Sequence, residues 1–181
     1  MIRFPKPYAD FVARLRVTVG FVLVAAFAWF SQPDARSLEI GLPVALAGLA
    51  LRAWAAGHLA KDRELATSGP YAYTRNPLYL GTLLVAAGLA IASRSIWPAV
   101  LFAAAFVGIY LPAIQLEEQH LRRLFPEYAA YAMRVRALVP GRRVQLSRRR
   151  FEWRLYVKNR EYQAGAGLVA GVVFLVWRAV Q

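Results

Sequence analysis

The residues with the clearest chemical potential lie in one stretch, Gly69 to Gly81, which combines a Gly-Pro turn with an arginine and several tyrosines. Pro77 suits the first turn of a helix, because its missing N–H and fixed φ cost nothing there. Asn76, directly before it, is a natural N-cap. The free N–H groups of such a helix attract anions, and Arg75 adds a positive charge. The stretch therefore predicts a carboxylate or phosphate site; the alternative is a capped helix start with interfacial tyrosines.

Two adjacent carboxylates, Glu117 and Glu118, form a second polar cluster with His120. On a helix, Glu118 has Arg122 four residues on, the favourable order for a surface ion pair. Leu121 takes that place for Glu117, which gains no cation at this spacing. A carboxylate near a helix C-terminus is disfavoured by the dipole unless a cation is supplied. We therefore predict a surface salt bridge for Glu118 and a pocket position for Glu117, where a ligand ammonium or sulfonium supplies the charge.

Arg52 and His58 lie in one apolar segment. Ionisable groups inside a membrane span usually face the bundle interior and mark function, so both are candidate substrate-binding residues; the alternative is snorkelling toward the interface. The chain has no cysteine and only two histidines. This composition excludes thiolate zinc sites and cysteine nucleophiles, and it predicts no metal site.

Five apolar segments must position these groups: about residues 17–30, 38–60, 78–92, 96–116 and 164–177. A spanning helix needs about 20 residues, so the second and fourth are long enough, and the others must borrow flanking residues. The chain is 59% hydrophobic with mean hydropathy +0.37, against about 45–50% apolar in soluble domains. The sequence therefore predicts an all-α integral membrane protein with about five spans, in one domain covering residues 1–181.

Basic residues set the expected orientation. With the N-terminus in the cytosol, 19 basic residues lie on the cytosolic side and 3 on the other, a bias that fits the positive-inside rule and a bacterial inner membrane. A nucleic-acid binder shares the net charge of +13 but does not need such long apolar runs. The basic block at residues 142–150 is expected to bind anionic lipid headgroups.

Three motifs, in order, resemble the isoprenylcysteine carboxyl methyltransferase family. Residues 69–81 resemble its G-x-Y-x-x-x-R-H-P-x-Y-x-G signature, Glu117-Glu118 resembles its paired glutamates, and residues 125–140 resemble its C-terminal motif of Phe, Glu, Tyr, Arg-Val and Pro. Order and spacing agree over roughly residues 48–140. Phospholipid methyltransferases share this general layout.

The resemblance implies S-adenosylmethionine as the methyl donor, in a cytosolic pocket open sideways to the bilayer for a lipophilic acceptor. It implies catalytic roles for Arg75, Asn76 and Glu117, and acceptor binding by Arg52 and His58. The cofactor-binding residues would be Tyr71, Tyr79, Gly81, Glu117, Glu118, His120, Tyr131 and Arg134.

Two departures from the family pattern bear on function. Asn76 replaces the usual histidine and cannot act as a base, because an amide does not titrate. Since a carboxylate acceptor needs no base, this favours a carboxylate acceptor, or a purely binding role for this position. Residues 141–181 extend beyond the core at residues 1–140. The alternatives are a lipid N-methyltransferase and, from another class, a non-catalytic membrane scaffold or lipid-binding protein.

Overall fold

The computed structural model describes residues 4–144 and 149–181, and these contain helices and no strand. One isolated parallel bridge joins Thr74 and Arg136. The helices are α1 (Lys6–Phe30), α2 (Ala35–Ala56), the 3₁₀ turn η1 (Gly69–Ala72), α3 (Pro77–Ala92), α4 (Ile96–Ala105), the π-helical turn η2 (Phe106–Tyr110), α5 (Leu111–Leu124), α6 (Tyr128–Arg134), α7 (Trp153–Lys158) and α8 (Tyr162–Ala179).

The all-α membrane fold predicted from the sequence is confirmed. In the described part of the chain, three helices are long and apolar enough to cross a bilayer: α2, the continuous helix Ile96–Leu124, and α8. The apolar runs Thr18–Phe30 and Pro77–Ala92 are shorter. One boundary is wrong, because α2 ends at Ala56 and His58 therefore follows the helix instead of lying within it. His58 Nδ1 lies 2.9 Å from the Trp54 carbonyl oxygen in the turn that ends α2.

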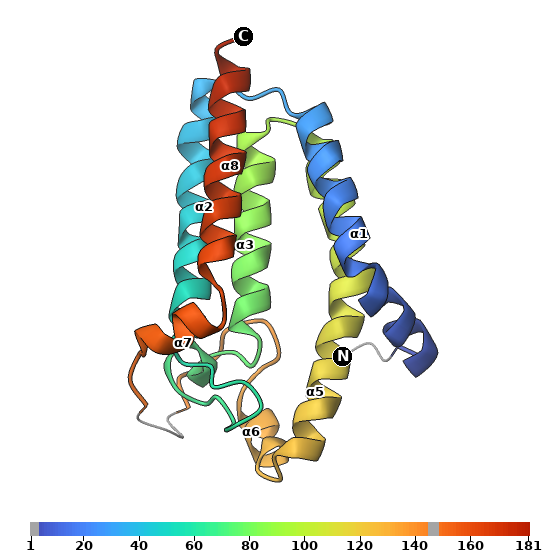
Figure 1. Ribbon diagram of the computed structural model, residues 1–181, viewed down its shortest axis with the longest axis vertical. Helices are drawn as coiled ribbons and strands as arrows, with labels where there is room; N and C mark the ends of the chain where they lie inside the picture. The colour runs from blue at the N-terminus through green and yellow to red at the C-terminus, as the bar shows by residue number, and fades with distance from the viewer. Residues whose placement is uncertain (1–3, 145–148) are drawn as a thin grey trace.

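Helices α2 and α3 pack backbone against backbone through glycines. A Cβ on Gly48 would lie 2.7 Å from the Gly81 carbonyl, and one on Gly88 would lie 2.6 Å from the Gly41 carbonyl. Small residues at such positions let membrane helices approach closely. The fixed α2–α3 pair provides one side of the molecule, and α8 packs against both helices (Figure 1).

The opposite side consists of α1 packed on the long helix Ile96–Leu124 (Figure 1). Pro112 has no N–H to donate to the carbonyl four residues earlier, and that carbonyl, on Gly108, lies in the π-helical turn. The Tyr8 hydroxyl donates a hydrogen bond of 2.8 Å to it instead. A local defect in the long helix therefore anchors the start of α1.

The connections gather at two ends of the bundle. The α1–α2 and α3–α4 turns meet at one end, where the Gln32 N–H donates to the Ser93 carbonyl at 2.8 Å (Figure 1). The segments 57–76, 125–144 and 149–160 gather at the other end, with α6 and α7. The polar groups singled out in the sequence therefore share one end of the molecule, with Arg52 about one turn before the end of α2.

Candidate active site

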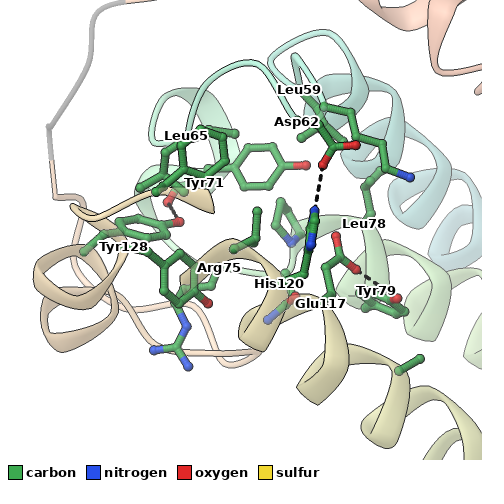
Figure 2. A pocket seen from close by; sticks show the side chains of 18 of the residues that line it. Leu59, Asp62, Leu65, Tyr71, Arg75, Leu78, Tyr79, Glu117, His120 and Tyr128 are labelled. Carbon is green, nitrogen blue, oxygen red and sulfur yellow. Dashed lines mark hydrogen bonds and ion pairs between the residues drawn. The ribbon is translucent and has the colours of Figure 1, made fainter. Parts of the chain in front are cut away.

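A cavity of about 840 Å³ lies between the start of α3, the helix α5 and the segment that follows α2. Its polar lining residues are Arg52, Lys61, Asp62, Glu64, Arg75, Asn76, Thr82, Glu117 and His120. Its aromatic and aliphatic wall includes Tyr71, Tyr79, Tyr110, Tyr128, Tyr131, Leu59, Leu65, Leu78, Leu116, Leu121 and Phe125. Both sides of the helix bundle contribute, so the cavity spans the junction between them (Figure 2).

A buried ion pair between Arg75 and Glu118 closes one side of this junction. Arg75 Nη2 lies 2.8 Å from Glu118 Oε1, and the two side chains are 11% and 10% exposed. Arg75 Nη1 donates to the carbonyls of Ala132 and Val135, at 2.8 and 3.0 Å. The surface salt bridge predicted for Glu118 is therefore wrong: the carboxylate turns inward because a buried guanidinium needs a charge partner.

Asn76 belongs to the same buried cluster. It is the N-cap residue of α3 by position, but its side chain makes no capping hydrogen bond. Its Nδ2 instead donates to Glu118 Oε1 at 3.4 Å and to the Ala137 carbonyl at 3.0 Å. Arg75 and Asn76 thus line the cavity while their polar groups tie α3 to α5 and to the segment after α6.

Glu117 differs from its neighbour. Its carboxylate lines the cavity and accepts a hydrogen bond of 3.1 Å from the Tyr79 hydroxyl (Figure 2). Within residues 4–144 and 149–181, no basic side chain forms an ion pair with it. The ring of Tyr79 also packs edge-on against Tyr110, with centroids 6.3 Å apart. Glu117 is therefore an accessible cavity carboxylate that is oriented by a phenol and open to a cation.

Three buried tyrosines shape the wall opposite Glu117. The Tyr131 hydroxyl donates to the Tyr71 carbonyl at 2.8 Å and thereby joins α6 to η1. Burial raises the pKa of Tyr71, Tyr128 and Tyr131 above the usual value of 10, and in Tyr71 the charge of Glu117 raises it further. The phenols therefore stay neutral at physiological pH and can serve as hydrogen-bond donors and aromatic walls.

Arg52 lines the cavity at membrane depth, with its charge paired. Its Nε lies 2.5 Å from Glu161 Oε1, and its Nη2 lies 3.0 Å from Glu161 Oε2. Sequence reasoning missed Glu161, although an arginine within a span demands an acidic partner at similar depth. The position of Glu161, an acidic residue directly before the last apolar run, was the signal that could have identified this partner.

The remaining predicted site residues are spread over different places. His120 lines the cavity and lies 3.2 Å from Asp62. Gly81 is buried at the α2–α3 contact, where a Cβ would lie 2.5 Å from Arg52 Cγ. His58 is outside the cavity lining and packs edge-on against Phe151.

Arg134 also lies outside the main cavity, at a smaller pocket of about 370 Å³. Of the basic block expected to bind lipid headgroups, Arg142, Arg143 and Arg150 are exposed, and Arg149 pairs with Glu64 and Glu152. Arg148 lies outside the described residues.

Comparison with known proteins places the chain in a family. The profile of the phospholipid methyltransferase family matches residues 44–128, which contain most of the cavity lining. The nickel-cobalt-cadmium resistance protein NccN of Alcaligenes xylosoxydans xylosoxydans is 34% identical over 151 residues, covering 77% of this chain and 71% of that protein. The chain belongs to the phospholipid methyltransferase family.

A second relative is the cobalt-zinc-cadmium resistance protein CzcN of Cupriavidus metallidurans, 34% identical over 151 residues, or 80% of this chain and 69% of that protein. No solved structure matches the chain. Among the described residues, no group of three or more His, Cys, Asp or Glu side chains is placed to hold a metal ion. This member of the phospholipid methyltransferase family is thus an all-α membrane protein whose cavity at one end is lined by both polar and apolar side chains.

Proposed function

We propose that the protein transfers a methyl group from S-adenosylmethionine to a lipophilic amine that enters the cavity from the bilayer. The observation that carries the proposal is Glu117, an accessible cavity carboxylate with a phenol to orient it and no ion-pair partner among the described residues. Such a carboxylate attracts a cation, and the cofactor carries an ammonium and a sulfonium.

The cavity residues fit this cofactor in three respects. Glu117 would hold the ammonium, and the exposed Lys61 at the cavity would hold the carboxylate. The neutral rings of Tyr71, Tyr79 and Tyr131 would contact the adenosine or the sulfonium by stacking and cation–π interaction. A cavity of about 840 Å³ lies within the usual range for sites of this kind, about 300–1,000 Å³. The bound cofactor supplies an activated methyl group.

Arg75 does not fit the anion-binding role that the sequence predicted for the start of α3. Its guanidinium is committed to Glu118 and to two backbone carbonyls. We assign Arg75, Asn76 and Glu118 to holding the cavity in shape. Since the Asn76 amide is also committed, its replacement of histidine gives no information about the acceptor.

Charge favours an amine over a carboxylate acceptor. The two arginines that line the cavity, Arg52 and Arg75, are each paired with a buried carboxylate. An amine must lose its proton before it attacks, and His120, 3.2 Å from Asp62, lines the cavity in a position to accept one. Alignment and a dry surrounding supply the remaining acceleration. A carboxyl acceptor of the isoprenylcysteine type is the rival.

Calorimetry tests cofactor binding on the purified full-length protein. We expect S-adenosylmethionine to bind, and Glu117→Gln to weaken binding by about ten- to a hundredfold, because a charge-assisted hydrogen bond contributes roughly 1.5–3 kcal/mol. Glu39→Gln, an exposed carboxylate on α2 away from the cavity, is the matched control and should bind as the native protein does. No binding by the native protein would favour the scaffold alternative.

A labelled-methyl assay distinguishes the acceptor classes. Amine-bearing lipids and prenylcysteine analogues are offered separately, and the product is treated with base. We expect label transfer to the amine lipid and a base-stable product. Base-labile label on the prenylcysteine analogue would instead identify a carboxyl ester and establish the rival.

A further inference from the structure

The contact between Arg52 and Glu161 joins the membrane-depth wall of the cavity to the C-terminal helix. Both carboxylate oxygens of Glu161 engage the guanidinium, at 2.5 and 3.0 Å. The Glu161 side chain is 6% exposed and that of Arg52 is 23% exposed. On the other side, Arg52 Nη1 donates to the Thr82 hydroxyl and to the Leu78 carbonyl on α3. Arg52 is therefore held from two helices while part of it still borders the cavity.

The turn between α7 and α8 fixes Glu161 in this place. Asn159 Nδ2 donates to the carbonyls of Ala56 and Leu59, both at 2.9 Å, and so caps the end of α2. Arg160 adopts a left-handed backbone with φ of 54°, which reverses the chain between the two helices. The Glu161 N–H donates to the Tyr156 carbonyl at 3.3 Å. The turn packs on the end of α2 and places the Glu161 carboxylate beside Arg52.

This pair sets the charge of the cavity wall at Arg52. A guanidinium has five N–H donors, and the four contacts above leave Arg52 one donor without a partner among the described residues. Without Glu161, Arg52 would present a full cation at the cavity and attract any anionic headgroup. With Glu161 in place, the same wall presents a hydrogen-bond donor without net charge.

We propose that Glu161 is a specificity-determining residue, which masks Arg52 and thereby keeps anionic amphiphiles out of the cavity. The proposal rests on the proposed function in that the cavity is taken as the acceptor site. It gives the C-terminal segment a role, because Glu161 lies outside the matched residues 44–128. The shared chemistry of the excluded ligands is an oxyanion, either phosphate or carboxylate, on an alkyl chain.

Binding of soluble short-chain amphiphiles tests the proposal without the cofactor. Octyl phosphate and N-octanoylglycine supply the two oxyanions, and octyltrimethylammonium supplies a cation; each is titrated by calorimetry into the full-length protein in a neutral detergent. We expect the native protein to prefer the cation. Glu161→Gln should strengthen binding of at least one anion by about tenfold or more, because it leaves Arg52 unpaired.

The double variant Arg52→Gln/Glu161→Gln should return anion binding to the native level. Glu152→Gln, a carboxylate of the same segment that pairs with Arg149, is the matched control and should bind as native. Whichever anion gains more identifies whether the wall fits phosphate or carboxylate. If Glu161→Gln does not fold, Arg52→Gln serves in its place, and its unpaired Glu161 should strengthen cation binding by about tenfold.

Unchanged anion binding in Glu161→Gln, or an equal gain in the double variant, would overturn the proposal; for Arg52→Gln, unchanged cation binding would do so. These results are independent of S-adenosylmethionine. A native protein that does not bind the cofactor contradicts the proposed function alone, while the amphiphile titrations still decide the role of Glu161.

Discussion

The two sides of the cavity are built in opposite ways. On one side, α2 and α3 touch backbone to backbone through Gly41, Gly48, Gly81 and Gly88, and α8 packs against both. On the other side, α1 and the long helix Ile96–Leu124 contact the first side mainly at two ends. One end is the turn at Ser93, and the other is the buried Arg75–Glu118 pair.

This difference explains why a cavity exists at this place. Close glycine packing leaves no space between α2 and α3. The start of α3 and helix α5 instead approach each other through side chains, such as Tyr79 with Tyr110 and Glu117, and the cavity lies between them. The residues with functional potential line that space, and the residues that join its two sides hold its shape. Adjacent carboxylates on α5 illustrate the division, since Glu118 joins the sides and Glu117 faces the cavity.

Breaking the junction should have the largest effect. Glu118→Gln leaves the Arg75 guanidinium buried without a counter-charge, and such losses cost about 3–5 kcal/mol. We expect thermal unfolding in detergent, followed by circular dichroism, to begin at a clearly lower temperature. Glu117→Gln, one residue away, is the control and should unfold as the native protein does. Equal unfolding temperatures for the two variants would show that the pair does not hold the sides together.

Disturbing the glycine-packed side should have the next largest effect. A Cβ on Gly48 would lie 2.6 Å from the Val85 nitrogen, so Gly48→Ala must push α2 and α3 apart. Overpacking of this kind costs about 1–3 kcal/mol. The matched control is Gly167→Ala on α8, which has no atom within 4 Å of its new Cβ and should be neutral or slightly stabilising. If both variants unfold alike, close packing is not what fixes this side.

The tyrosines at the junction should have the smallest effect at neutral pH, and their ionisation should appear only in alkali. Burial raises the folded-state pKa of Tyr71, Tyr128 and Tyr131 above 10. Their contribution to stability is therefore complete below about pH 10 and is lost as the pH rises further. Absorbance at 295 nm should show these three of the nine tyrosines ionising only as the protein unfolds.

Tyr131→Phe, which loses the hydrogen bond to the Tyr71 carbonyl, should lower the free energy of unfolding by about 1 kcal/mol. In the alkaline titration, ionisation of all nine tyrosines while the protein is still folded would contradict the burial of these three.

The sequence by itself determined the elements of this protein. Apolar runs predicted helices at all five places, because a chain at membrane depth must satisfy its backbone internally. The motifs at residues 69–81 and at Glu117 indicated the family and one end of the bundle as the functional end. These features depend on local composition and spacing, which can be read along the chain.

Only the tertiary structure decided which charges pair. Helical spacing predicted that Glu118 pairs with Arg122, but its carboxylate pairs with Arg75, 43 positions away in the chain. Arg52 pairs with Glu161, 109 positions away, and this contact ties the start of the C-terminal helix to a residue of the cavity wall. Buried charges select the partner that reaches them in the folded chain, because an unpaired buried charge costs far more than a surface pair gains.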